Sequence, residues 1–329
     1  MAPAAALAEG TSIVACFSRE KSRADEFAKI HGALAAYTSV DEMLADSRVE
    51  VVFVASPNHL HAEHAKLAAK AGKHVLVEKP MATSAFDCVE MIKTCKANNV
   101  KLGVGFQLRF HPGHMTASRV VREGGIGQVA LAQVLLGSGV RGQTKRETRT
   151  GLREWWETPH MVGNARSMIG TGVHCVDDLE FILGQTVVEV AAISDGQTEN
   201  YPLEDLVSLS LRFSGGTIGT MVCGSRVPDS INDVTVYGSD GRIQLKNAAS
   251  PTMGGSLEIK SQSVNSEVTY ESDAQALAKW QIEGFNRAIR LDTEPAASGT
   301  DGLRSVQITE AMIDSVRTKR TVTVEPIQV

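Results

Sequence analysis

The 329-residue chain lacks any apolar run of the roughly 18 residues that crossing a bilayer requires. Its first ten residues are rich in alanine but have no basic start, which is atypical of a secretory signal peptide. The net charge is only -5 and the pI is about 6.0, with no basic patch, so we expect no nucleic-acid partner. The basic stretch from Arg141 to Arg153 also contains Glu147, and we predict a solvated loop there.

Cysteine is scarce, and the cysteine pattern favours neither a disulfide framework nor a zinc site. The five cysteines are odd in number and widely spaced, and no CxxC pair occurs among them. We therefore predict free thiols in a reducing, cytoplasmic compartment and no zinc site. Cys88 and Cys95 lie seven positions apart in a predicted helix, a spacing that favours packing in the core.

The first third of the chain alternates short apolar strands with helical segments. Strands are predicted over residues 12–17, 50–55, 74–77 and 101–106, and helices over 22–31, 58–72 and 84–98. Ser39 with Glu42 three positions later predicts a capping box at the start of a further short helix. This alternation is typical of βαβ units and a parallel sheet.

After Gln107 the pattern changes. Helices are predicted over residues 112–123, 166–183, 273–291 and 301–318, and strands dominate from 187 to 268. Gly215-Gly216 and Ser239-Asp240-Gly241 each separate two apolar runs, as in β-hairpins. A last short strand is predicted at 321–324. The sequence therefore predicts an α/β protein of two domains, residues 1–107 and 108–329, the second with a mostly antiparallel sheet.

Polar side chains follow three consecutive predicted strands of the first domain. The strand at 50–55 runs into Ser56-Pro57-Asn58-His59, the next into Glu78-Lys79-Pro80, and the fourth into Gln107-Leu108-Arg109. Each group alone is an ordinary polar loop. Since ligands of such sheets bind at the carboxyl ends of the strands, the three together predict a binding site at one edge.

These residues carry a family resemblance. Val51 to Ala82 (VVFVASPNHLHAEHAKLAAKAGKHVLVEKPMA), Gly103 to Pro112 (GVGFQLRFHP), Gly170 to Leu183 (GTGVHCVDDLEFIL) and the pattern from Gly302 to Ser315 resemble the glucose–fructose oxidoreductase / inositol dehydrogenase (Gfo/Idh/MocA) family. The resemblance covers almost the whole chain. It implies an N-terminal Rossmann domain, then an α/β domain with a large open sheet that mediates homodimers or homotetramers.

The resemblance also implies catalytic roles for two residues. Lys79 matches the family's catalytic lysine, and a cation beside a reacting hydroxyl would stabilise the developing alkoxide. His174 matches its proton-transfer residue, and a histidine pKa of about 6.5 suits that exchange near neutrality. As a lone histidine in a half-apolar helix, His174 would otherwise be expected in the core.

The cofactor contacts that the resemblance implies lie at the same edge of the sheet. Around the nicotinamide they are Ser56, Pro57, Asn58, His61 and Lys79, with Glu78 at the ribose and Arg109 at substrate or nicotinamide. His59 and His64 are expected to face solvent.

Cofactor choice is expected at the end of the first predicted strand. NAD sites usually place an acid there for the ribose 2′-hydroxyl. This chain instead has Ser18 and Arg19, with Arg23 close behind, and guanidinium groups suit a 2′-phosphate. We therefore favour NADP(H), with NAD(H) as the alternative; in the simpler interpretation, Arg19 and Arg23 form only a solvated helix start.

Substrate contacts are expected from a Trp-containing segment ahead of His174. Family members place a tryptophan and a Gly-rich turn there, so the candidates are Trp156, His160, Asn164 and Arg166, together with Arg109, His174 and Asp177. A loop pinned by core tryptophans is the alternative interpretation of the same residues.

The chain departs from the family pattern in two places. It has no G-x-G-x-x-G turn to hold a pyrophosphate, and Met1 to Gly10 matches the helix that follows that turn. We expect a start upstream, because the missing strand would be central and its neighbours would lose their backbone partners. Gly170 also replaces an aspartate that many members carry, while Asp177 or Asp178 is expected to orient the His174 ring.

The sequence thus predicts hydride transfer between NADP(H) and a secondary alcohol or ketone of a sugar, anhydro-sugar, inositol or related cyclic polyol. A dihydrodiol dehydrogenase is the nearest alternative. Two further alternatives are a regulatory protein that senses dinucleotide without catalysis, and an inactive fragment.

Overall fold

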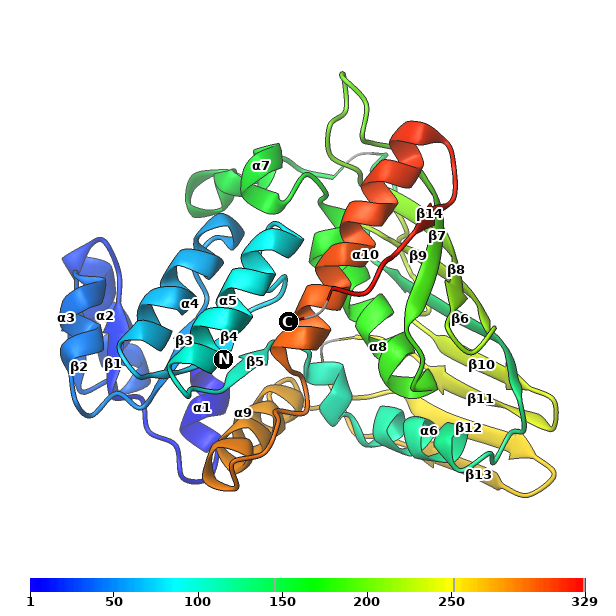
Figure 1. Cartoon of the computed structure of the whole chain (residues 1–329), viewed down its shortest axis with the longest axis horizontal. Helices are drawn as coiled ribbons and strands as arrows, with labels where there is room; N and C mark the ends of the chain where they lie inside the picture. Colours follow the sequence, from blue (N-terminus) through cyan, green and yellow to red (C-terminus); the bar gives the residue numbers. More distant parts are fainter. Residues whose placement is uncertain (145, 251, 328) are drawn as a thin grey trace.

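The computed structural model describes every residue except 145, 251 and 328 (Figure 1). It has the predicted α/β architecture, an N-terminal Rossmann-type part followed by a part built on a large, mostly antiparallel sheet. In Figure 1 the first part lies on the left and the large sheet on the right, with helices between them.

The N-terminal part contains short parallel strands joined by helices, as predicted. Its elements are α1 (Ala2–Leu7), β1 (Ala15–Phe17), α2 (Lys21–His31), β2 (Ala35–Tyr37), α3 (Val40–Ala45), β3 (Val51–Val54), η1 (Asn58–Leu60), α4 (His61–Lys70), β4 (His74–Val77), α5 (Ala85–Ala97) and β5 (Leu102–Val104). Ser39 caps α3 by accepting a hydrogen bond from the Glu42 backbone N–H at 3.4 Å. Cys88 and Cys95 are buried on α5, as their spacing predicted.

The parallel strands form two separate pieces. β1 pairs only with β2, while β3, β4 and β5 form a three-stranded sheet, and among the described residues β1 and β3 do not pair. One edge of β3 therefore carries backbone donors and acceptors without a strand partner.

The C-terminal part is built on nine strands in the order β13-β12-β11-β10-β6-β9-β8-β7-β14. Its strands are β6 (Val129–Gly137), β7 (Val187–Ser194), β8 (Leu206–Phe213), β9 (Ile218–Gly224), β10 (Val234–Gly238), β11 (Gly241–Lys246), β12 (Ser256–Ser261), β13 (Asn265–Thr269) and β14 (Val322–Thr323). Both predicted hairpins, β8–β9 and β10–β11, are present and antiparallel. β6 pairs in parallel with β9 and was not predicted.

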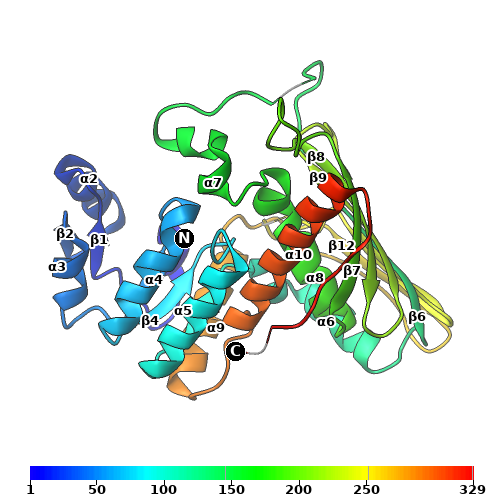
Figure 2. The same cartoon turned by 45° about the horizontal axis from the view of Figure 1, so that its top comes forward.

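Helices cover one face of this sheet (Figure 2). The helical elements of the C-terminal part are η2 (Gln107–Phe110), α6 (Pro112–Arg122), η3 (Gly151–Glu157), α7 (Pro159–Val162), η4 (Met168–Gly172), α8 (Val173–Leu183), α9 (Ala276–Arg290) and α10 (Gly299–Thr318). Along β8, Leu209 and Leu211 are buried against the helices while Ser210 and Arg212 face outward, which is the predicted alternation. Self-association through the outer face stays a prediction.

The last quarter of the chain returns to the N-terminal sheet. The Val104 backbone N–H donates to Ala297 O at 3.0 Å, and Gln281 Nε2 donates to Val104 O at 2.8 Å. α9 packs against α1, with Phe285 and Ile282 in a common apolar cluster with Leu76. The boundary at 107/108 stays a prediction, and this packing shows that residues beyond it help to fix β4 and β5.

No helix among the described residues combines the length and the apolar character needed to cross a membrane.

Candidate active site

Lys79 lies just beyond the carboxyl end of β4 and reaches into the C-terminal part. Its Nζ donates a hydrogen bond of 2.6 Å to the backbone oxygen of Gly170. The Lys79–Pro80 peptide bond is cis. The two predicted motifs, Glu78-Lys79-Pro80 and Gly170 to Leu183, therefore meet although 91 positions separate the two bonded residues.

A π-helical turn, η4, presents the Gly170 carbonyl and leads directly into α8. Glu204 fixes the start of this turn, since its Oε1 accepts the backbone N–H groups of Arg166 at 3.0 Å and Met168 at 2.8 Å. Gly172 lets the turn pack on β9, because a Cβ there would lie only 3.0 Å from Cys223 Sγ. Such π-turns are frequent at functional sites.

His174 is the second residue of α8 and is only 5% exposed. Its Nδ1 is buried without a hydrogen-bond partner among the residues that the structure describes, and its ring and that of Phe106 meet edge-on at a centroid distance of 6.2 Å. Burial, together with the positive charge of Lys79, holds the pKa of His174 well below its usual value. The imidazole is thus neutral at neutral pH and able to accept a proton.

Lys79 and Glu78 share this environment. Burial lowers the pKa of Lys79, the Glu78 carboxylate opposes that effect, and the charge of Arg149 adds to it. Burial also raises the pKa of Glu78, whose Oε2 accepts the Lys79 backbone N–H at 3.2 Å. The ammonium is therefore only partly compensated by protein groups, which suits a cation that acts on a bound oxygen atom.

His61 joins the ends of two neighbouring strands. Its Nδ1 lies 2.8 Å from Pro80 O and its Nε2 lies 2.7 Å from Ser56 O, and the ring is 1% exposed. A neutral imidazole has one N–H, so one of these two backbone oxygens accepts a hydrogen bond from the ring, and this geometry supports positioning of the Lys79–Pro80 segment. Direct contact of His61 with a cofactor stays a prediction.

Two neighbouring histidines are less exposed than predicted. His64 Nδ1 lies 3.0 Å from Ser56 Oγ, and His59 Nδ1 is buried without a partner beside the Trp155 ring. The prediction that they face solvent is wrong, because His59 lies beside Trp155 of η3, which packs with α7 over this end of the N-terminal sheet, and His64 lies against Phe17 of β1 (Figure 2). Asn58 is also buried there, and its Nδ2 has no hydrogen-bond partner in the described part of the chain.

Arg109 and Asp177 bind each other. Arg109 Nη2 lies 2.7 Å from Asp177 Oδ1 and 2.8 Å from Asp301 Oδ1, and Nη1 donates to Ala296 O at 2.8 Å. Asp178 binds His114, with 2.6 Å between Oδ1 and Nδ1. Neither aspartate binds His174, so the prediction that one of them orients its ring is wrong. The roles of Arg109 and Asp177 toward ligands stay predictions.

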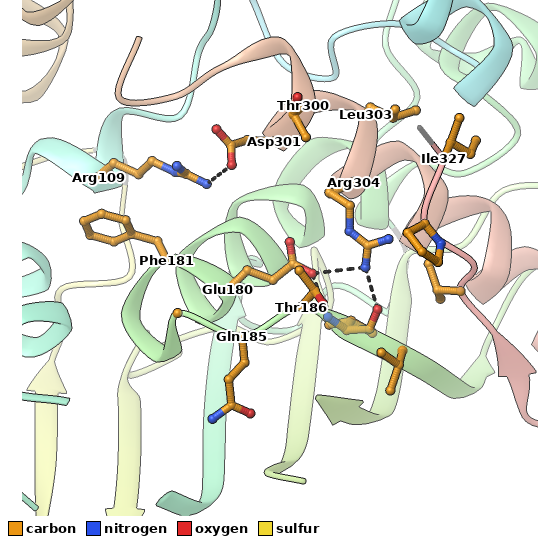
Figure 3. A pocket seen from close by; sticks show the side chains of 15 residues that line it. Arg109, Glu180, Phe181, Gln185, Thr186, Thr300, Asp301, Leu303, Arg304 and Ile327 are labelled. Carbon is orange, nitrogen blue, oxygen red and sulfur yellow. Dashed lines mark hydrogen bonds and ion pairs between the residues drawn. The ribbon is translucent and has the colours of Figure 1, made fainter. Parts of the chain in front are cut away.

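A cavity of about 430 Å³ lies beside this ion pair, at the far end of α8 from His174 (Figure 3). Figure 3 shows Arg109 directed at Asp301, and Arg304 directed at Glu180. Neither Lys79 nor His174 lines this cavity. It is therefore separate from the candidate active site.

The segment before η4 covers the candidate site with charged and aromatic side chains. Glu157 and Asp205 each bind both Arg146 and Arg166. Trp155 and Trp156 are stacked at a centroid distance of 4.8 Å. The prediction of a solvated loop over 141–153 is therefore wrong for Arg146, whose carboxylate partners are provided by later parts of the chain.

The remaining substrate and cofactor candidates are mostly accessible. His160 and Asn164 are exposed, and Asn164 has a φ of 58°. Arg166, in contrast, is bound by Glu157 and Asp205. At the end of β1, Arg19 is exposed and Arg23 pairs with Glu20 at 3.0 Å. The Ser18 hydroxyl accepts the Glu20 backbone N–H at 3.4 Å. Contacts of all these residues with ligands stay predictions.

Sequence reasoning missed two residues of the site. Phe106 contacts His174, and its only signal in the sequence was its place at the end of the fourth predicted strand, which in the structure ends earlier, at Val104. Arg149 lies over the Trp156 ring, 4.4 Å from guanidinium carbon to ring centroid. It was hidden in the basic stretch because nothing local marks which of its arginines lies against Trp156.

Two family models match the chain. The model described as "Oxidoreductase family, NAD-binding Rossmann fold" matches residues 1–106, and the GFO/IDH/MocA C-terminal domain model matches residues 114–244.

Individual relatives span most of the chain. A 1,5-anhydro-D-fructose reductase from Ensifer adhaerens is 27% identical over 97% of this chain and 92% of its own length. A trans-1,2-dihydrobenzene-1,2-diol dehydrogenase from Mus musculus is 30% identical over 73% and 68% respectively. The crystal structure of an aldose-aldose oxidoreductase from Caulobacter crescentus with glycerol superposes with a TM-score of 0.83 at 26% identity, covering 98% of this chain and 94% of that one.

The lowered pKa of His174 predicts a pH-dependent stability. As the pH falls below about 6.5, the unfolded chain takes up a proton at this position before the folded protein does, so stability falls by up to about 1.4 kcal/mol per pH unit. His174→Leu should remove this contribution. Urea unfolding at pH 7.5 and 5.5 measures it as a smaller loss of free energy in the variant than in the wild type.

His160→Leu is the matched control, since it replaces an exposed histidine of the same part. It should retain the loss of stability at low pH that is assigned to His174. Equal losses in the wild type and in His174→Leu would show that the imidazole is not held neutral by the fold.

Proposed function

Because the chain belongs to the GFO/IDH/MocA oxidoreductase family, we propose that it transfers hydride between NADP(H) and a secondary alcohol or ketone of a sugar-like substrate. Sugars, anhydro-sugars, inositols and related cyclic polyols form this substrate class. The observation that carries the proposal is the hydrogen bond from Lys79 Nζ to Gly170 O, which places an ammonium beside the turn that leads into His174.

The residues at the ends of β3 and β4 fit the nicotinamide part of a dinucleotide. Asn58 has a buried amide nitrogen to which no described residue hydrogen-bonds, and Glu78 places a carboxyl group next to Lys79. Orphaned polar atoms are costly, about 1–3 kcal/mol each, and a bound ligand would satisfy them. No described residues form a Gly-rich cradle for the diphosphate, so we assign none to it.

A bound nicotinamide would supply the hydride donor or acceptor. In our proposal the protein moves the proton and stabilises charge. Neutral His174 accepts the proton of the substrate hydroxyl, and its low pKa keeps it ready to do so. Lys79 donates a hydrogen bond to the same oxygen as negative charge develops there.

The substrate class is supported by the relatives of known activity. The anhydro-fructose reductase and the aldose-aldose oxidoreductase are named for sugar chemistry. The dihydrodiol dehydrogenase supports a second candidate function, oxidation of a cyclic diol. Both candidates need the same two side chains, and a panel of polyols and dihydrodiols separates them.

Replacing Lys79 by alanine should lower turnover by about 10²- to 10³-fold, because the developing oxyanion loses its donor. The measurement is NADPH formation or consumption with a panel of sugars, inositols and dihydrodiols. Lys93→Ala, on the exposed face of α5, is the matched control and should retain full activity. The proposal would be refuted if the wild type were inactive on all members of the panel, or if the Lys79→Ala variant were fully active.

NADP(H) preference is proposed to come from Arg19. Its exposed guanidinium at the end of β1 would bind a 2′-phosphate, so Arg19→Ala should weaken NADPH binding by about 10- to 100-fold and leave NADH binding unchanged. Fluorescence titration with both dinucleotides measures this. Lys29→Ala, an exposed cation at the other end of α2, is the control. Tighter binding of NADH than NADPH by the wild type would overturn the preference.

A further inference from the structure

One arginine at the candidate site has no acidic partner. Glu157 and Asp205 are each bound by both Arg146 and Arg166, which leaves the Arg149 guanidinium without a carboxylate among the residues that the structure describes. Only its backbone N–H reaches Glu157, at 2.9 Å. Buried or half-buried cations normally find a counter-charge, so an unpaired one at a site is a candidate for anion recognition.

The position of Arg149 is fixed by an aromatic ring. Its guanidinium carbon lies 4.4 Å from the centroid of Trp156, a cation–π contact that holds the group in one plane. The backbone hydrogen bond to Glu157, the next residue after that tryptophan, anchors the same arginine. A guanidinium held in this way presents a fork of donors that matches a carboxylate.

Trp156 connects Arg149 to the reacting groups. A Cβ built on Gly170 would have the Trp156 Cζ3 atom at 3.9 Å as its nearest neighbour, so the space beside Gly170 is open. The same Gly170 accepts the hydrogen bond of Lys79. Arg149, Trp156 and Lys79 therefore border one region, and no carboxylate stands at position 170 to balance their charge.

We propose that the substrate is a sugar acid, and that its carboxylate binds the Arg149 guanidinium above Trp156 while Lys79 and His174 act on a neighbouring carbon. This inference rests on the proposed function and narrows it from neutral polyols to anionic ones. The charge balance supports it, because burial and repulsion from Arg146, Arg153 and Arg166 lower the pKa of Arg149 in spite of the attraction of Glu157. An anion in the site would relieve that repulsion.

The test uses matched pairs of sugars that differ only in a carboxylate, D-glucose with D-glucuronate and D-galactose with D-galacturonate. Binding is followed by tryptophan fluorescence without dinucleotide, and turnover is then measured with NADP⁺. The wild type should bind at least one uronate about tenfold or more tightly than its neutral partner. Arg149→Gln should lose about 10- to 100-fold in affinity for that uronate, and Arg149→Lys should recover part of it.

Arg153→Gln is the matched control, since it removes one positive charge from the same segment at an exposed position. It should keep the preference for the uronate. NADPH affinity should be the same in Arg149→Gln and the wild type. If NADPH binding falls and the uronate preference is unchanged, Arg149 binds a dinucleotide phosphate and the proposal is overturned.

Measurements on the wild type alone also test the inference, even if the Arg149→Gln variant does not fold. Equal binding of neutral and acidic sugars overturns this inference, and Lys79-dependent turnover of the neutral sugars would leave the proposed function standing. Arg149-dependent uronate binding without turnover of any sugar would show an anion site but would refute both the proposed function and the assignment of the uronate as substrate.

Discussion

The hydrogen bond between Lys79 Nζ and Gly170 O joins the two halves of the molecule at the point where chemistry is proposed. Its donor stands at the end of a parallel strand, and its acceptor stands in a π-helical turn on the sheet of the other half. If either element shifted by a residue, the ammonium and the His174 helix would no longer meet. The rest of the structure can be understood as what holds these two elements in place.

Each element has its own support. On the Lys79 side, His61 ties Ser56 O to Pro80 O, and α9 packs beneath β4 and β5. On the Gly170 side, Glu204 binds the backbone of η4, and Gly172 permits close approach to β9. Most of these supports are buried in a packed interior, which is the condition under which a few polar groups can be held for catalysis.

The sequence predicted the local parts of this arrangement well. Strand β4 with Lys79 at its end, the hairpins and the helix of His174 follow from apolar periodicity, turn residues and the family resemblance. It missed β6, whose residues pair with β9 and β10 across long stretches of sequence, as in Leu131 with Ile218 and Val134 with Val234. It also missed β2, which has only three residues. Short strands are defined by their neighbours more than by their own composition.

The same distinction applies to the site. Lys79 and His174 were found because their motifs are local, whereas Arg149 was missed because its significance depends on Asp205 and Glu157 being taken by other arginines. Asp177 was expected near His174 because it is close in sequence, yet its carboxylate turns to Arg109. Charge pairing across long sequence separations is therefore the part of the site that required three-dimensional information.

The central claim is that Lys79 and His174 share one electrostatic environment, and an NMR titration of the His174 ring tests it most directly. The pKa of His174 should lie below 6.5 in the wild type and should rise in Lys79→Met, because a nearby positive charge is removed while burial is retained. A His174 pKa that is the same in both proteins would show that the two groups do not face each other, and would contradict the account.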